Sequence, residues 1–379
     1  MKVEFYRHNL QEEDIARLVE VCRGVFLTTG QDVKAFEEAF AGYLGARHAI
    51  GVTSCTAALH IALLAVGAGP GDEVITTPMT FAATSNTVLY TGATPVFVDV
   101  EPDTGLISAD AVERAITPRT KAILPVHLYG LMADMRRLKA IADRAGVALI
   151  EDCAHTIEAD RDGVRPAQLS DAACFSFYAT KNITSGEGGA VVTNSAEIAD
   201  RVRLLRQHGM SASASDRYTG TYRHWDLELL GWKYNMTNLQ AALLVGQIDR
   251  MDALWKRREA IAVRYEHGFR DVDGVSFPIV PAGARSARHL FTIWVDPARR
   301  DEVLGDLQAR GIGVAVNYRA VHLLKYYRER LGLPRGTFPN AERIGDSTVT
   351  LPLYPKLADV EVDYVVESVK ASVATPSRV

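Results

Sequence analysis

Two residues with reactive side chains follow predicted strands near the middle of the chain. Asp152 ends the apolar run 147–152, and Lys181 closely follows the run 173–177. Because ligands collect at the carboxyl ends of strands in parallel α/β sheets, we expect both side chains to meet one ligand. A lysine amine forms a Schiff base with an aldehyde, and a carboxylate keeps a pyridine nitrogen protonated. The pair therefore predicts pyridoxal 5′-phosphate (PLP) held as an internal aldimine on Lys181, with Asp152 at the pyridine nitrogen.

Taken singly, these residues are weak signals, because a lone lysine is often a surface residue and an aspartate after a strand is often a helix cap. Three further features support the pair. Segment 53–56 (TSCT) lies where the first strand turns into a helix, and a helix N-terminus attracts phosphate, although the segment also suits an ordinary N-cap. The glycine-rich turn 185–189 lets the backbone approach a neighbour closely. Phe81 suits stacking on a pyridine ring, although a solitary aromatic also suits a core.

Other chemistries find less support in the sequence. The glycine-rich segment 67–71 follows a helix instead of a strand and contains Pro70, so we interpret it as a helix end and not as a dinucleotide-binding turn. His155, His208 and His322 are scattered, and we predict no metal site. The four cysteines show no CxxC spacing, which argues against zinc and disulfides.

Composition places the chain among ordinary enzymes. Its 379 residues are enough for two domains with their own cores. Hydrophobic residues make up 47% and charged residues 23%, and the net charge of −4 offers no general attraction for nucleic acid or anionic membranes. The N-terminus lacks the apolar run of a secretory signal. We therefore expect a cytoplasmic protein with no nucleic-acid or membrane partner.

Short β-branched runs alternate with helical periodicity from about residue 48 onward. This βαβ rhythm predicts an α/β fold whose main sheet is mostly parallel, seven-stranded and covered by helices on both faces. The predicted strands are 48–54, 73–77, 95–100, 122–126, 147–152, 173–177 and 189–193. The clearest helices of this part are 56–66 and 132–145, the second of which Gly146 should end.

A change of composition after residues 231–240 indicates a second lobe. We predict a large PLP-binding domain at 1–245, which includes an N-terminal arm, and a small C-terminal α/β domain at 246–379. The elements expected in the small domain are helices 251–269, 301–310 and 358–373 and a strand at 290–295. The tail 375–379 is expected to fray.

Several segments together resemble the PLP-dependent sugar-nucleotide aminotransferases of fold type I (the aspartate aminotransferase fold). They are TSCTAALH (53–60), EDCAH (151–155), SFYATKNIT (176–184), EGGA (187–190) and GWKYNMT (231–237). The resemblance covers nearly the whole chain in the expected order. Within the family, KNIT with EGG, and later YRAVH (318–322) and KYYRER (325–330), are most similar to UDP-4-amino-4-deoxy-L-arabinose/oxoglutarate aminotransferase and related nucleotide-sugar 4-aminotransferases.

The resemblance implies a role for each matching position. Lys181 would be the Schiff-base lysine and general acid/base, Asp152 the partner of the pyridine nitrogen, and His155 a neighbour of the ring hydroxyl. His322 would lie near the sugar. The residues implied in cofactor binding are Ser54, the Cys55 backbone and Ser176 at the phosphate, Phe81 on the ring, and Asn235 of the partner subunit. Such sharing implies a homodimer.

The resemblance also implies the reaction. Relatives that perform sugar deoxygenation carry histidine in place of the lysine, so the presence of Lys181 favours transamination. Many relatives have a small residue where this chain has Cys55, and glutamine where it has His155; both replacements still allow cofactor contacts. We expect an aminotransferase that moves the amino group of L-glutamate to a 4-keto sugar nucleotide for polysaccharide, lipopolysaccharide or antibiotic biosynthesis. The alternatives are a 3-keto-sugar or keto-cyclitol aminotransferase, or a non-catalytic PLP-fold scaffold or sensor.

Overall fold

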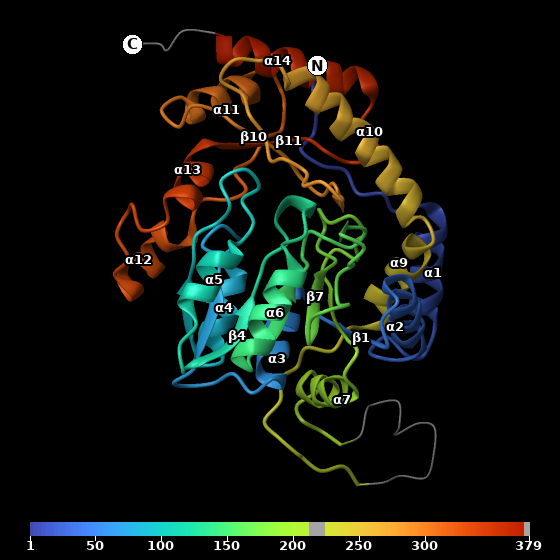
Figure 1. Cartoon of the computed structure of the whole chain (residues 1–379). Coiled ribbons are helices and arrows are strands. Elements are labelled where there is room, and N and C mark those ends of the chain that lie inside the picture. The colour runs from blue at the N-terminus through green and yellow to red at the C-terminus, as the bar shows by residue number, and fades with distance from the viewer. Residues whose placement is uncertain (212–223, 375–379) are drawn as a thin grey trace.

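The computed structural model describes residues 1–211 and 224–374 and shows two lobes (Figure 1). A large sheet with its helices forms one lobe, and the C-terminal helices arch over one end of it. The fraying expected at 375–379 lies outside the described residues. Along the described ranges, no helix combines the length and apolar character needed to cross a bilayer.

The main sheet has the seven strands that the sequence predicts. Their order is β1-β8-β7-β5-β4-β2-β3, and only β8 runs against its neighbours. The bounds are β1 His48–Val52, β2 Glu73–Thr76, β3 Thr94–Phe97, β4 Thr120–Leu124, β5 Ala148–Asp152, β7 Ala172–Ser176 and β8 Gly189–Thr193. The prediction of a mostly parallel α/β sheet is therefore confirmed.

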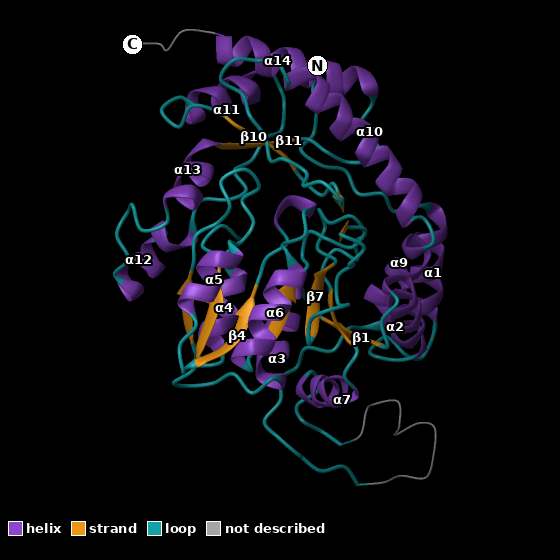
Figure 2. Ribbon diagram, in the orientation of Figure 1, coloured by secondary structure: helices purple, strands orange, loops and turns teal. Residues whose placement is uncertain are grey.

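Helices cover both faces of this sheet (Figure 2). Successive side chains of a strand point to opposite faces, and β7 shows the result: Cys174 packs in one core, and Phe175 packs in the other. The first face carries α3 (Cys55–Ala65), α4 (Ala83–Tyr90) and α7 (Ala196–Leu205). The second carries α2 (Gln31–Leu44), α5 (Ala109–Ala115), α6 (Met135–Ala145) and α9 (Asn238–Ile248).

Local signals explain where individual helices begin and end. Helix α6 begins at Met135, three residues later than predicted, because the Asp134 side chain accepts a hydrogen bond from the Arg137 N–H and caps the helix. Gly146 ends the helix as predicted, with a left-handed φ of 66°.

A second core lies in the C-terminal lobe. It is built on α10 (Met251–Phe269), the antiparallel pair β10 (Phe291–Trp294) and β11 (Thr348–Leu351), α11 (Arg300–Ala309) and α14 (Asp359–Ala374). Val3 packs into this core, so the N-terminal arm reaches across to the small lobe. The remaining elements are α1 (Glu12–Arg23), α12 (Lys325–Leu331), α13 (Pro339–Ser347), η1 (Leu128–Gly130), η2 (Val321–Leu323) and the pair β6 (Asp160–Arg161) and β9 (Ala284–Arg285).

The predicted domain boundary at 245–246 falls inside helix α9. Leu244 and Ile248, on either side of that point, both pack in the core that α9 shares with α2 and the main sheet. The division into domains at that residue stays a prediction.

Candidate active site

The strand register brings the chemistry-bearing residues to one edge of the sheet. Asp152 is the last residue of β5, and Cys174, beside it in β7, is two residues before Ser176. Val52 at the end of β1 pairs with Gly189, which also pairs with Ser176. The turn after β1 therefore lies on the same edge as the carboxyl ends of β5 and β7.

The Lys181 amine lies at this edge of the sheet, and its pKa is lowered. Its Nζ lies 3.4 Å from Nε2 of His289. Lys181 keeps part of its surface open to solvent, yet desolvation lowers the pKa of its amine from 10.5 to about 8, against the opposing effects of Cys55 and Asp152. About a tenth of the amine is consequently neutral, and hence nucleophilic, at pH 7, far more than for an ordinary lysine.

The Asp152 carboxylate is buried and held by two donors. Its Oδ2 accepts a hydrogen bond of 2.8 Å from Thr84 Oγ1, and its Oδ1 accepts one of 3.1 Å from the Ala154 N–H. Burial raises the pKa of Asp152, and these hydrogen bonds together with the charge of Lys181 oppose that rise. The donors fix the orientation of a carboxylate that can pair with a cationic ring nitrogen.

His155 lies beside Lys181 and Asp152, and its hydrogen bonds define its tautomer. The Tyr129 N–H donates to its Nδ1 over 3.2 Å, so the ring proton is on Nε2, which lies 3.2 Å from the Tyr318 hydroxyl. Desolvation lowers the pKa of His155 well below its usual value and keeps the ring neutral. Tyr318 comes from the small lobe, and its ring centroid is 5.8 Å from that of Phe81, whose side chain is 61% exposed.

The turn after β1 has the features of a phosphate seat. Ser54 caps helix α3, since its Oγ accepts from the Ala57 N–H over 3.1 Å, and Cys55 begins the helix. The glycine turn predicted to allow close backbone approach meets this same turn: a Cβ at Gly189 would lie 2.4 Å from the Ser54 carbonyl carbon and 2.6 Å from the Cys55 nitrogen. The buried Ser176 completes the edge.

Gly189→Ala should weaken the binding of the cofactor. The added methyl group must push the Ser54–Cys55 turn away, because both close atoms belong to backbone. We expect the affinity for PLP to fall about tenfold or more, which corresponds to about 1.4 kcal/mol. Fluorescence titration of the apoprotein with PLP measures it. Gly42→Ala is the matched control, since a Cβ there meets nothing within 4 Å; equal affinities for both variants would contradict the expectation.

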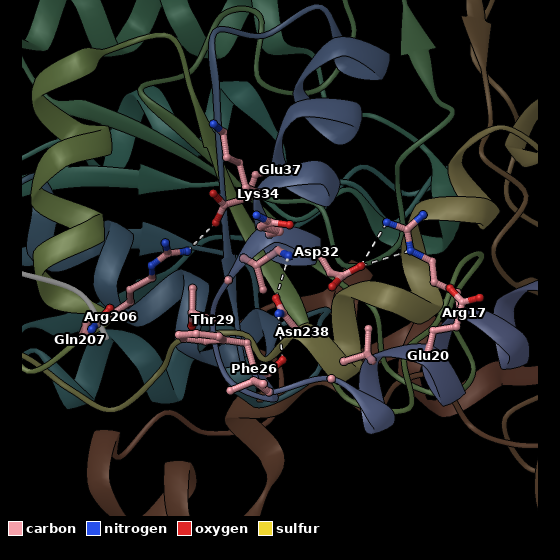
Figure 3. A pocket seen from close by; sticks show the side chains of 16 residues that line it. Arg17, Glu20, Phe26, Thr29, Asp32, Lys34, Glu37, Arg206, Gln207 and Asn238 are labelled. Carbon is pink, nitrogen blue, oxygen red and sulfur yellow. Dashed lines mark hydrogen bonds and ion pairs between the residues drawn. The ribbon is translucent and has the colours of Figure 1, made fainter. Parts of the chain in front are cut away.

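Asn235 lies beside the end of β1, with a bridge to Val52. Its side chain is buried, and its Nδ2 donates to Thr29 Oγ1 over 2.7 Å and more weakly to Thr28. Thr29 also lines a wide pocket of about 960 Å³ that opens between the loop before α2 and Arg206 (Figure 3). The predicted reach of Asn235 toward a partner's cofactor stays a prediction.

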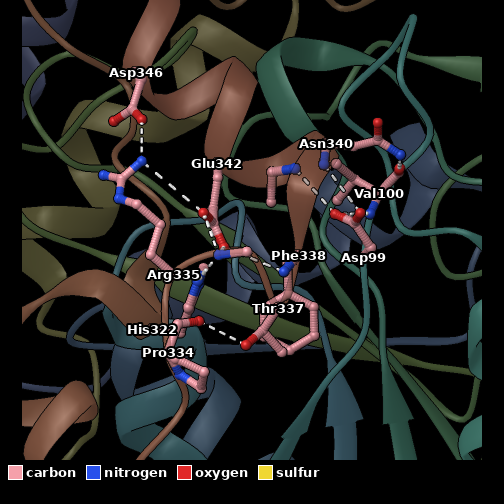
Figure 4. A network of polar contacts seen from close by, with 12 residues as sticks. Asp99, Val100, His322, Pro334, Arg335, Thr337, Phe338, Asn340, Glu342 and Asp346 are labelled. Atoms are coloured by element: carbon pink, nitrogen blue, oxygen red, sulfur yellow. Dashed lines mark hydrogen bonds and ion pairs between the residues drawn. The ribbon is translucent and has the colours of Figure 1, made fainter.

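His322 is fully buried in the small lobe (Figure 4). Its Nε2 lies 3.1 Å from Oε1 of Glu342, which also accepts hydrogen bonds from the N–H groups of Gly336 and Phe338. Desolvation lowers the pKa of His322. In the structure, His322 anchors the turn that leads into α13, and its contact with a sugar stays a prediction.

Among the described residues, one buried group brings three potential metal ligands within 4.8 Å of one another: His127, Glu151 and Cys153. The carboxylate of Glu151 already accepts hydrogen bonds from groups of the protein. Glu151 pairs with His127 Nε2 at 2.6 Å and accepts hydrogen bonds from the Ala167 N–H and from Ser170. The backbone N–H of His127 donates to the Asp152 carbonyl, so this group stabilises the end of the strand that carries Asp152.

Three residues of the site were missed by sequence reasoning as individual contributors: Thr84, His289 and Tyr318. Thr84 and His289 contact Asp152 and Lys181 from 68 and 108 residues away along the chain. No local spacing relates such distant positions. Tyr318 stood inside a quoted motif, but its partner His155 lies 163 residues away.

The fold and the site define a fold type I PLP-dependent aminotransferase. The chain belongs to the DegT/DnrJ/EryC1/StrS aminotransferase family, whose sequence profile matches residues 8–370. The expected enzyme class, fold and PLP cofactor are thereby confirmed.

Similar proteins extend over nearly the whole chain. Spore coat polysaccharide biosynthesis protein SpsC of Bacillus subtilis (strain 168) is 43% identical over 95% of this chain and 94% of its own. A putative sugar aminotransferase, Spr1654 from Streptococcus pneumoniae, solved in its PMP form, has a TM-score of 0.92 and 30% identity, covering 98% and 99% of the two chains. DesV of S. venezuelae, solved with a ketimine intermediate, has a TM-score of 0.90 and 36% identity, covering 97% and 95%. The chain is thus a sugar aminotransferase.

Proposed function

We propose that the enzyme moves the amino group of L-glutamate to the 4-keto carbon of a sugar nucleotide in the cytoplasm, with 2-oxoglutarate as the second product. The observation that carries the proposal is the meeting of the Lys181 amine and the Asp152 carboxylate at one edge of the sheet, in a chain of the sugar aminotransferase family. The quoted motifs favour carbon four and glutamate by resemblance.

The residues at this edge suit PLP in type and position. The turn in which Gly189 lies against Ser54 and Cys55 provides N–H groups at the N-terminus of α3 for a phosphate, and Ser176 adds a hydroxyl. The exposed Phe81 ring offers a stacking surface. When bound, PLP would carry the amino group between the two substrates, and its ring would serve as an electron sink.

The chain's own groups then control charge and protons. Asp152 stabilises a proton on the ring nitrogen, and the Nε2–H of His155 is available to donate to the ring hydroxyl. Lys181 would hold the cofactor covalently. Its amine, whose pKa desolvation lowers to about 8 in this structure, would remove the proton from the donor's α-carbon and return a proton on the sugar side.

We also propose a homodimer whose active sites are shared through Asn235. The exposed apolar side chains of Val25, Leu27 and Leu230 support a subunit contact near the loop that holds Asn235. Hybrid dimers with one Lys181→Ala subunit and one Asn235→Ala subunit, purified through two tags, should recover about half of wild-type activity, because one site keeps both residues. Hybrids with only about half the activity of the Asn235→Ala homodimer would exclude shared sites.

The substrate is tested by product formation. Purified enzyme with PLP and [15N]glutamate is incubated with UDP-, dTDP- and GDP-linked 4-keto sugars, with a 3-keto sugar nucleotide and with keto-inositols, and products are analysed by mass spectrometry. We expect 15N in a 4-amino sugar nucleotide. 15N in a 3-amino sugar nucleotide or an aminocyclitol would show that the substrate is that compound's keto form and not a 4-keto sugar nucleotide. If no product carries 15N, this class of substrate is wrong.

A further inference from the structure

A chain of hydrogen bonds leads from the Lys181 amine into the protein. Lys181 Nζ lies 3.4 Å from His289 Nε2, and the other ring nitrogen, Nδ1, lies 3.0 Å from Asn182 Oδ1. Asn182 Nδ2 donates to Glu158 Oε2 over 2.8 Å. Glu158 in turn is paired through its other oxygen with Arg258, and both of these side chains are almost completely buried.

This chain determines which nitrogen of His289 carries the proton. Asn182 Nδ2 faces two acceptors, the Glu158 carboxylate and the Ala287 carbonyl, so the amide must point its NH₂ group toward them. The reverse orientation would set the amide oxygen against both acceptors. The amide oxygen therefore faces His289, whose Nδ1 must donate to it. Nε2 is left without a proton, and its lone pair faces Lys181.

We propose that His289 is a positioning residue that accepts an N–H of the Lys181 amine at Nε2 and so directs the lone pair of the neutral amine toward the reacting carbon. Asn182 and Glu158 act through His289 by fixing its tautomer. A free ammonium or amine on a four-carbon stem rotates among many orientations, and a misplaced catalytic atom costs rate steeply. One fixed acceptor removes most of those orientations.

The surroundings of His289 agree with a neutral acceptor. Its side chain is buried, and the charged or titratable groups that act on it are Lys181, Arg258 and His155, whose ring centroid is 4.5 Å away. The small cavity beside it is also lined by Tyr6, Arg7, His8 and Tyr354. Desolvation and these neighbours lower the pKa of His289 well below its usual value. The group that faces Lys181 is thus an uncharged lone pair.

Two substitutions separate positioning from packing. His289→Gln keeps an acceptor near the position of Nε2, while His289→Leu fills similar space without one. For the glutamate half-reaction, we expect His289→Leu to lower kcat about 10–100-fold with the KM for glutamate changed less than about threefold. His289→Gln should recover most of the loss. Asn182→Leu no longer fixes the tautomer of His289, so its kcat should lie between those of His289→Leu and His289→Gln.

A second readout needs neither cofactor nor substrate. In the full-length apoprotein, the pKa of Lys181 is measured from the pH dependence of its reductive methylation, followed by peptide mass spectrometry. Removing an acceptor from a partly desolvated amine destabilises its ammonium form, so His289→Leu should lower this pKa relative to wild type, and His289→Gln should leave it close to wild type.

Two results overturn the inference. Equal kcat values in the Leu and Gln variants would mean that a hydrogen-bond acceptor at this position does not matter, and an unchanged Lys181 pKa in His289→Leu would mean that no hydrogen bond reaches the amine. The inference rests on the proposed role of Lys181 as the catalytic amine. If the substrate assay fails with the wild type, the methylation result still decides the His289 contact by itself.

Discussion

Lys181→Ala should lower the kcat/KM of transamination by at least about 10⁴-fold and leave the fold intact. The substitution removes both the covalent attachment point of PLP and the group that transfers the proton, and proton transfer by a positioned side chain alone contributes about 10²–10⁴-fold. Glutamate-dependent formation of 2-oxoglutarate measures the rate, and circular dichroism with thermal unfolding measures the fold.

Lys370→Ala is the control for this variant, because Lys370 lies on the outer surface of α14. Among the described residues, its side chain forms an ion pair only with Glu367. We expect its rate to match the wild type. Steady transamination by Lys181→Ala at more than about one percent of the wild-type rate would show that another amine does the chemistry.

Asp152→Asn should lower kcat about 10²–10³-fold and weaken the binding of PLP. Asparagine has the same shape: its single amide oxygen can accept from the Ala154 N–H while its amide nitrogen donates to the Thr84 hydroxyl, so the main change is the loss of the negative charge. Without that charge the ring nitrogen loses its proton and the cofactor becomes a poor electron sink, an electrostatic loss of the size seen when one stabilising group is removed from an active site. Single-turnover kinetics with glutamate measure the step itself.

Thr84→Val provides a graded comparison for Asp152→Asn. It removes one of the two hydrogen bonds that hold the carboxylate but keeps the charge, so kcat should fall only about tenfold. If Asp152→Asn retained activity within about twofold of wild type, or if Thr84→Val were the more damaging change, the carboxylate would not serve the ring nitrogen.

The sheet could be predicted because its strands are buried on both faces and therefore appear in the sequence as continuous apolar runs. For the same reason Asp152 and Lys181 stand out, since each follows such a run. Parallel strands with this rhythm place those two positions on one edge, and the register confirms that Asp152 and the end of β7 are neighbours.

The partners of these residues could not be predicted, because packing between distant segments selects them. His289 and Tyr318 enter the site from the C-terminal lobe, and their spacing from Lys181 and His155 carries no periodic signal. Gly189 shows the intermediate case: its turn was predicted to approach a neighbour closely, but only the strand pairing identifies that neighbour as the Ser54–Cys55 turn.

We expect Lys181 to carry PLP and to exchange an amino group between glutamate and a keto-sugar nucleotide. The most direct measurement is the visible absorption spectrum of the purified protein with PLP, before and after glutamate, and then after a 4-keto sugar nucleotide. We expect a visible band of the lysine-bound cofactor that bleaches with glutamate and returns with the keto sugar. No such band, or the same band in Lys181→Ala, would contradict it.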